Sequence, residues 1–431
     1  MNRIKIVAAF FFVSCFLPIN LFAQKAYSLE QCKSMALENN NSIKNSRLDI
    51  EIASQTRKEA FTNYFPSVSA TGMTFEASEG MAQMDLMLPN MPQPLPMSLL
   101  KNGKIAGITA LQPIFAGGQI ITGNKLARLG QDVSKYKLQL SENEVIEITE
   151  KYFWQIVSLK EKLKTIATVE AQLNQIAKDV DMAVKAGITT RNDLLRIELQ
   201  QQNVASNRLK IENGLSISQM LLRQHIGAET TDFEIAFDGF GDLQSPEVYY
   251  ISAEEAVYRR TEVQLLDKSV QASKLQKQMT VGKNLPTLGV GVGYMYHDLL
   301  EKDTDFGVVF ASVSVPISSW WGGSHSIKRE KFKQQQAENN RQNTIEFLTV
   351  DIQQRWNELQ ESYKQIMLAE KSISSATENL RLNENCYKAG TTSISDLLDA
   401  QTLFQQSKDQ YSDACTEYKQ KLTRYLQATG R

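Results

Sequence analysis

Few side chains of this 431-residue sequence stand at the spacings that catalysis or metal binding requires. The three histidines are His225, His297 and His325, and none lies in a two-histidine metal spacing or beside a pair of cysteines. The sequence also has no nucleophile elbow and no phosphate-binding loop. It therefore predicts a protein that is not an enzyme and that needs no cofactor or resident metal.

Two aspartates, Asp396 and Asp399, form the most suggestive polar pair. On a helix, residues three apart lie on one face, so both carboxylates would point the same way. Asp396 also has a purely structural interpretation, because Ser393-x-x-Asp396 is a capping-box pattern that recurs as Thr190-x-x-Asp193. Asp399 has no capping role, and the alternative for it is an exposed, solvated helix face.

Residues 78–103 hold a second unusual group, which consists of methionines and prolines. Thioethers bind Cu(I) and Ag(I), so metal efflux is one interpretation of this segment. Packing of the apolar side chains against one another is the favoured alternative. The methionines are Met81, Met84, Met87, Met91 and Met97, and the prolines are Pro89, Pro92, Pro94 and Pro96.

Residues 1–23 have the pattern of a secretory signal peptide. Arg3 and Lys5 precede an apolar run that is too short for a membrane-spanning helix, and Ala23 provides a small residue for cleavage. Acylation at Cys15 is an alternative, but the residues around this cysteine suit a lipoprotein signal poorly. The sequence thus predicts an exported protein.

The composition of the rest of the chain excludes several classes of protein. With 47 Lys and Arg against 48 Asp and Glu, there is no basic surface for nucleic acid. No later stretch is apolar enough for a helical membrane anchor. Cys32, Cys386 and Cys415 would remain after export, which allows at most one disulfide bond.

The chain is a tandem duplication. Lys185-Ala186-Gly187 recurs as Lys388-Ala389-Gly390, and Asp193-Leu194-Leu195 recurs at the same spacing as Asp396-Leu397-Leu398. Upstream, a proline followed by a glycine pair occurs in both halves, as Gly117-Gly118 and Gly322-Gly323. The repeated order of these features indicates two copies of one structural unit.

Each copy predicts a helix, two strands and a long helical hairpin. Residues 114–245 and 317–431 contain no proline, and their apolar residues alternate at threes and fours as in a coiled-coil seam. The first helix of each hairpin, of about 66 residues, would be about 100 Å long. Residues 288–297 alternate as a strand of about ten residues does, which is long enough to cross a bilayer.

These patterns define the expected domain organisation. A link at 227–250, in the equatorial region, separates the first repeat, 24–226, from the second, 251–431. The strands are expected at about 66–77, 104–115, 286–297 and 307–315, and the helical hairpins at about 121–226 and 324–427. Because four strands cannot close a barrel in lipid, the chain is expected to oligomerise, and three copies would supply twelve strands.

The sequence resembles the TolC-like outer-membrane efflux proteins over nearly the whole mature chain. The resemblance rests on the duplicated order of elements and on Gly-x-x-x-x-x-Asp-Leu-Leu at both hairpin turns. It implies a mainly α fold with a membrane β-barrel: a homotrimer with a shared 12-stranded barrel in outer-membrane lipid and an α-helical tunnel through the periplasm of a Gram-negative bacterium. It also implies a passive exit duct that works with an inner-membrane pump and a periplasmic membrane-fusion adaptor.

The resemblance further implies a closed periplasmic entrance at the hairpin tips, ringed by Asp396 and Asp399. Three copies would bring these carboxylates close together, which would raise some pKa values and attract cations. Tyr387 and Asp193 match two further gate positions, but Thr392 stands where the family has an arginine. Arg196 is a candidate substitute partner for Asp399 or Asp396.

The turn residues are expected to contact the adaptor. They are Gly187, Gly390, Leu194, Leu195, Leu397 and Leu398. On the family layout, residues 78–103 lie outside the cell, where their methionines and prolines would pack as a lid over the barrel. Trp320 and Trp321 would lie in a membrane-interface belt.

Two other functions stay open at this stage. The same duct can serve type I secretion of a polypeptide rather than efflux of small molecules. A periplasmic coiled-coil scaffold or adaptor with soluble hairpins is the other alternative, although it does not explain why equivalent junctions recur in both halves.

Overall fold

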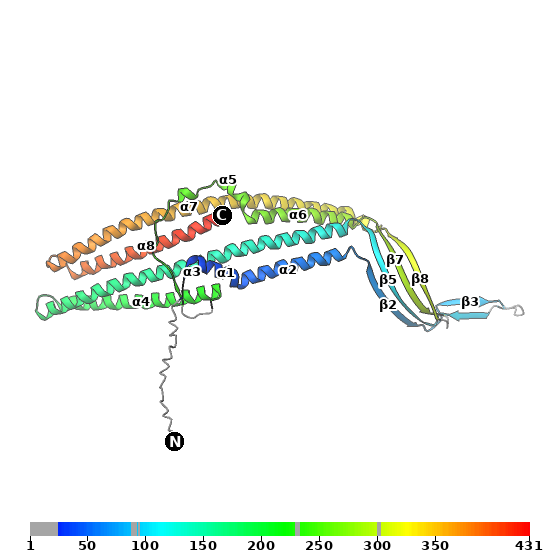
Figure 1. The fold of residues 1–431 in the computed structure, drawn as a ribbon, viewed down its shortest axis with the longest axis horizontal. Helices are drawn as coiled ribbons and strands as arrows, with labels where there is room; N and C mark the ends of the chain where they lie inside the picture. The colour runs from blue at the N-terminus through cyan, green and yellow to red at the C-terminus, as the bar shows by residue number, and fades with distance from the viewer. Residues whose placement is uncertain (1–24, 88–92, 94, 229–232, 300–302) are drawn as a thin grey trace, which may run out of the picture.

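The computed structural model describes residues 25–87, 93, 95–228, 233–299 and 303–431. The predicted signal peptide, including Cys15, and Met91 lie outside these residues. The molecule is long and thin, with the two helical hairpins at one end and the strands at the other (Figure 1). None of the described helices is long and apolar enough to cross a membrane.

The first repeat runs from the short strand β1 to helix α4. Ser28 caps α1 and forms a capping box with Gln31, while Asn40 both ends α1 and caps α2. The elements are β1 (Lys25–Tyr27), α1 (Leu29–Asn39), α2 (Asn41–Thr62), β2 (Ser67–Glu76), β3 (Ala82–Leu86), β4 (Leu95–Leu99), β5 (Asn102–Ala116), α3 (Gln119–Lys185) and α4 (Arg191–Ile226).

The second repeat follows a link that contains β6 (Phe233–Ile235), paired in parallel with β1, and the 3-10 helix η1 (Pro246–Tyr249). Its own elements are α5 (Ala253–Ala256), η2 (Val257–Arg259), α6 (Thr261–Gly282), β7 (Thr287–Asp298), β8 (Asp303–Ser314), α7 (Ser319–Lys388) and α8 (Ile394–Ala428). The order of helix, two long strands and long helical hairpin is therefore present twice, which confirms the predicted tandem architecture.

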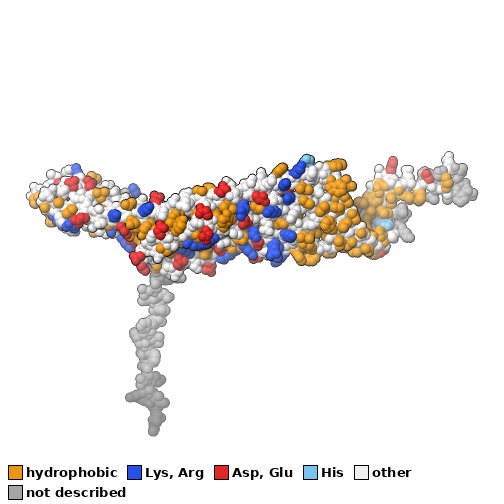
Figure 2. Space-filling view, turned by 90° about the horizontal axis from the view of Figure 1, so that it is seen from above, with side chains coloured by type: hydrophobic (Ala, Val, Ile, Leu, Met, Phe, Trp, Pro, Cys, Tyr) orange, Lys and Arg blue, Asp and Glu red, His pale blue; other side chains and the backbone are white. Residues whose placement is uncertain are grey.

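The four long strands form one antiparallel sheet in the order β2-β5-β7-β8. Pairing of β5 with β7 joins the two repeats, and the register shifts between Pro113 and Phe115, at the end nearest the helices. Strands β2 and β8 each have one unpaired edge. Figure 2 shows hydrophobic side chains gathered at this end of the molecule, and Val292 and Val309 of the sheet are 53% and 82% exposed.

The connection between β2 and β5 differs from the expected lid. Within it, β3 and β4 pair as a second antiparallel hairpin, with Met84 opposite Met97. This hairpin projects beyond the four-stranded sheet (Figure 1). Met84 is 51% exposed and Met87 is 84% exposed, so in a single chain these side chains do not pack over the strand ends.

Three hydrophobic clusters stabilise the helices. One cluster belongs to the first repeat and includes Phe153 and Ile156, and another belongs to the second and includes Ile352 and Leu359. A third lies near the hairpin tips and combines both repeats, with Leu173 as one member. The buried residues follow the seam that the sequence predicts, because residues three and four apart share one face of a helix.

The strand-to-helix junctions of the two repeats are not equivalent in detail. Gly117 and Gly118 both have positive φ, and a Cβ on Gly117 would lie 2.2 Å from the carbonyl oxygen of Gly282. Gly322 and Gly323 lie instead inside the first turns of α7. Both glycine pairs lie at strand-to-helix junctions, as expected, but they occupy different positions there, because α7 begins at Ser319, three residues before Gly322.

Trp320 and Trp321 lie in the first turn of α7 and are 50% and 81% exposed. The indole N–H of Trp320 donates to the carbonyl oxygen of Asn284, 2.9 Å away, and so ties α7 to the end of α6. A membrane-interface position for both indoles stays a prediction.

The three cysteines among the described residues form no disulfide bond. Cys32 and Cys415 are buried in different clusters, and Cys386 is exposed near the tip of α7. The sequence allowed at most one bridge, and none forms, since the fold places each of these three cysteines in a different part of the molecule. Among the described residues, no group of His, Cys, Asp and Glu is arranged to hold a metal ion.

Candidate functional site

The candidate site is the pair of hairpin turns where α3 meets α4 and α7 meets α8. Both turns use a glycine in the left-handed region, with φ of 72° at Gly187 and 71° at Gly390. The next residue closes each turn: Ile188 N–H donates to the Ala183 carbonyl and Thr391 N–H to the Cys386 carbonyl, both at 2.9 Å. The duplicated motif thus produces the same backbone turn twice.

Both predicted capping boxes are confirmed. Asp193 accepts hydrogen bonds from the Thr190 amide and from the hydroxyls of Thr189 and Thr190. Asp396 accepts 3.2 Å and 2.6 Å bonds from the amide and hydroxyl of Ser393. The strongest effects are the bonds from Thr189 and Ser393, which lower the pKa values of Asp193 and Asp396 respectively.

Thr392, at the position where the family has an arginine, donates from its hydroxyl to the Asp396 carboxylate at 3.0 Å. This side chain therefore strengthens the cap of α8. The Asp396 carboxylate is held by its own turn, whereas Asp399 is exposed and has no hydrogen bond or ion pair within the described chain.

Arg196 is exposed on α4 and contributes to the low pKa of Asp193 through its charge. Within one chain it forms no ion pair with Asp396 or Asp399 among the described residues. Its predicted role as their partner therefore requires a neighbouring copy of the chain.

Tyr387 lies between the two hairpins. It packs against the tip cluster, and burial raises its pKa, with further contributions from the negative charges of Asp193 and Asp179. Tyr387, Asp179 and Thr189 line a groove of about 580 Å³ between the tips of α3 and α7. The structure thus brings Tyr387 and Asp193 close together, whereas Asp399 is no part of this groove.

The four leucines of the turn motifs have different environments. Leu397 is 2% exposed and belongs to the tip cluster, against which Leu194 and Leu398 also pack. Only Leu195, which is 45% exposed, offers a large apolar surface. Leu397 is unsuited to contact a partner directly, because its side chain stabilises the tip itself.

Sequence reasoning missed a polar contact farther along the hairpins, where α8 meets α3. Asp413 accepts a 2.7 Å hydrogen bond from Ser158 and a 2.7 Å ion pair from Lys162. Asp409, one helical turn earlier, faces the same lysine, and burial raises its pKa to about 6. The sequence shows that Ser158 and Lys162, and likewise Asp409 and Asp413, are four residues apart and so share a helix face. It does not show that α3 and α8 pack against each other.

Comparison with known proteins agrees with this geometry. Residues 253–431 match the family described as "Outer membrane efflux protein". The chain is 18% identical to the outer membrane protein TolC of Vibrio cholerae over 335 residues, which cover 75% of this chain and 76% of TolC.

Solved structures have the same fold. The Campylobacter jejuni CmeC outer membrane channel superposes with a TM-score of 0.78 at 15% identity, over 93% of this chain and 85% of CmeC. The open state of the Neisseria gonorrhoeae MtrE outer membrane channel gives a TM-score of 0.71 at 15% identity, over 93% and 88%. The second repeat therefore matches the outer membrane efflux protein family, and the fold of both repeats is that of the TolC-like outer membrane channels.

Proposed function

We propose that the protein is the passive exit duct of a tripartite efflux system and that it acts as a homotrimer. The observation that carries this proposal is the four-stranded sheet with exposed apolar residues and two unpaired edges, β2 and β8. Unpaired backbone groups are costly in lipid, so the edges must pair with other copies of the chain. Three copies would supply twelve strands, which leave room for a passage, whereas eight would be filled by side chains.

The trimer can be tested through its edge strands. In a Cys386→Ser background, Val68→Cys in β2 is combined in turn with cysteine at Val309, Ala311 or Val313 in β8. If β2 of one chain pairs with β8 of the next, at least one combination gives covalent dimers and trimers on oxidation. If no combination gives a covalent species larger than the monomer, the closed barrel is refuted. Variants that carry only one of the two introduced cysteines serve as controls.

We further propose that Asp396 and Asp399 restrict the periplasmic entrance, with Arg196 of a neighbouring copy as a partner. Asp399 supports this best, because its carboxylate is exposed and has no structural role within the described chain. Mutual repulsion among such carboxylates would be relieved by a nearby guanidinium. Tyr387, which packs against the cluster formed by both repeats, would hold the two hairpins of each chain together at the same level, while Asp193 caps its own hairpin turn.

Single-channel conductance in planar bilayers tests the entrance, together with susceptibility of complemented cells to large antibiotics. Asp399→Ala and Arg196→Ala should each raise conductance and susceptibility, whereas Glu361→Gln, which changes an exposed carboxylate far from the tip, should not. If Arg196→Ala behaves like the Glu361 variant, Arg196 has no part in closure.

The adaptor and pump are proposed partners at the hairpin turns. Gly187 and Gly390 allow the tight turns, and Leu195 provides the exposed apolar side chain that a partner helix could cover. Leu195→Asp should abolish co-purification of the adaptor while leaving the trimer intact. Unchanged co-purification would show that the adaptor binds another surface of the protein.

A further inference from the structure

A second polar site lies far from the tips, where α8 ends and α6 begins. It is a pocket of about 320 Å³, which corresponds to about ten water molecules at about 30 Å³ each. One wall comes from α3 of the first repeat, with Gln139, Asn143 and Glu144, and the others come from the second repeat. The proposed duct function makes no use of this pocket.

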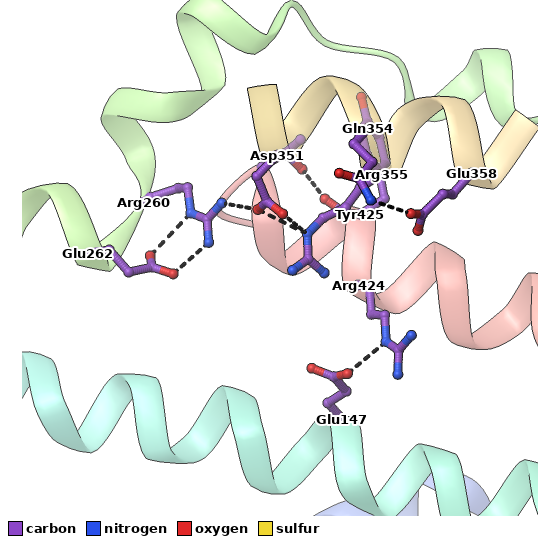
Figure 3. Close-up of polar contacts among 10 residues, drawn as sticks. Glu147, Arg260, Glu262, Asp351, Gln354, Arg355, Glu358, Arg424 and Tyr425 are labelled. Atoms are coloured by element: carbon purple, nitrogen blue, oxygen red, sulfur yellow. Dashed lines mark hydrogen bonds and ion pairs between the residues drawn. The ribbon is translucent and has the colours of Figure 1, made fainter. Parts of the chain in front are cut away.

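Arginines dominate the second-repeat side of the pocket. Arg260 is 8% exposed, and each of its three guanidinium nitrogens has a partner: two donate to the oxygens of Glu262 and one donates to Asp351 at 2.7 Å. Arg355 also donates to Asp351, through Nε at 3.1 and 3.0 Å. These contacts hold the arginine side chains in place (Figure 3).

Two guanidinium groups keep free donors. Arg355 bonds only through Nε, and Arg424 bonds only through Nε to Glu147 at 2.7 Å, so the four Nη groups have no partner among the described residues (Figure 3). The side chains are 31% and 38% exposed, which leaves them open to a ligand. A guanidinium fork with free Nη donors matches the oxygen atoms of a carboxylate or phosphate.

The remaining charges around the pocket are largely paired. Arg259 bonds Glu255, and Arg431 donates to the carbonyl oxygen of Tyr249. The exception is Glu144, which lines the pocket and forms no ion pair or hydrogen bond among the described residues. Thr261 and Glu262 open the 22-residue helix α6 at the pocket wall, and the positive end of its dipole adds to the attraction for an anion.

We propose that this pocket binds a small multivalent oxyanion, a phosphate or a polycarboxylate, through the Nη groups of Arg355 and Arg424. The bound anion would lie between α3 of the first repeat and the helices of the second. It would therefore link the two repeats where their hydrophobic clusters are separate. Glu144 opposes binding by repulsion.

The test uses the purified, detergent-solubilised full chain in a buffer without phosphate. Thermal unfolding and titration calorimetry are measured with inorganic phosphate, with citrate and with sodium chloride at matched ionic strength. Phosphate or citrate should bind saturably and raise the unfolding temperature, and chloride should not. A shift that depends on ionic strength alone, or no saturable binding of either probe, overturns the site.

Variants separate the site from general charge effects. Arg355→Gln and Arg424→Gln should each weaken binding by about 10- to 100-fold, as loss of charged hydrogen bonds does. Arg381→Gln, which removes an exposed arginine paired with Glu378 on α7, is the matched control and should not change affinity. Glu144→Gln should tighten binding several-fold, a gain that misfolding cannot produce. Equal affinities across all four variants would overturn the proposal.

Discussion

Asp409 offers a direct test of the contact between the two repeats. Its Oδ1 atom is buried and has no hydrogen-bond partner among the described residues. The nearby ammonium of Lys162 instead pairs with Asp413, which also takes the Ser158 hydroxyl. Burial raises the pKa of Asp409 from 3.8 to about 6; Lys162 opposes this change, Asp413 adds to it, and a bond from Gln405 opposes it weakly.

The change in pKa fixes the sign and size of the effect. Between about pH 4 and pH 6 the folded chain holds a proton on Asp409 that the unfolded chain has lost, so stability falls as pH rises through this window. A shift of about two pKa units corresponds to at most about 3 kcal/mol in the free energy of unfolding, and this stability is fully lost above about pH 6. Asp409→Asn removes the cost of burying an ionised carboxylate while keeping the shape of the side chain.

We therefore expect Asp409→Asn to stabilise the protein by about 1–3 kcal/mol at pH 7.5 and to have little effect at pH 4. Hydrogen exchange of α8 amides in the detergent-solubilised protein, measured from pH 4 to pH 8 and corrected for intrinsic exchange, reports this difference locally. Asp413→Asn is the matched control and should destabilise α8 at pH 7.5, because it weakens the contacts with Lys162 and Ser158. If wild type and Asp409→Asn show the same pH dependence between pH 4 and 6, the reasoning is refuted.

Three further predictions address other parts of the fold. Leu397→Ala should destabilise the hairpin tips by about 2–5 kcal/mol, seen as faster hydrogen exchange there, because Leu397 is 2% exposed in the tip cluster; protection equal to wild type would contradict this. Gly117→Ala should prevent trimer assembly, as measured by size-exclusion chromatography, because the new Cβ would lie 2.2 Å from the Gly282 carbonyl oxygen. Gly118→Ala places its Cβ where no atom lies within 4 Å, so its effect on assembly should be milder. A maleimide should label Cys386 in the folded protein and leave the two buried cysteines unlabelled until denaturant is added, and labelling at three sites under native conditions would show that the clusters are open.

Features that depend on neighbours in the chain were predictable from the sequence. The capping boxes at Asp193 and Asp396 and the left-handed glycines Gly187 and Gly390 follow from interactions across three to six residues. Helix length follows in the same way, because the apolar period and the absence of proline act locally. The duplication then implied two similar halves.

Features that depend on residues far apart in the chain were not predictable. Leu195 and Leu398 occupy equivalent positions in the two turn motifs, yet Leu195 is 45% exposed whereas Leu398 packs against the cluster formed by both repeats. The segment between β2 and β5 pairs with itself as β3 and β4, a hairpin that no pattern in its sequence predicted.

The sequence by itself determined the repeats, the long helices and the geometry of both turns, because each depends on contacts within a few residues. Tertiary structure alone decided that Asp409 is buried against Lys162 and that Arg355 and Arg424 share one pocket. Burial and charge pairing depend on which helices pack together, and α3 and α8 lie in different repeats. Which carboxylate has a raised pKa and which arginines keep free donors therefore depends on how the two repeats pack side by side.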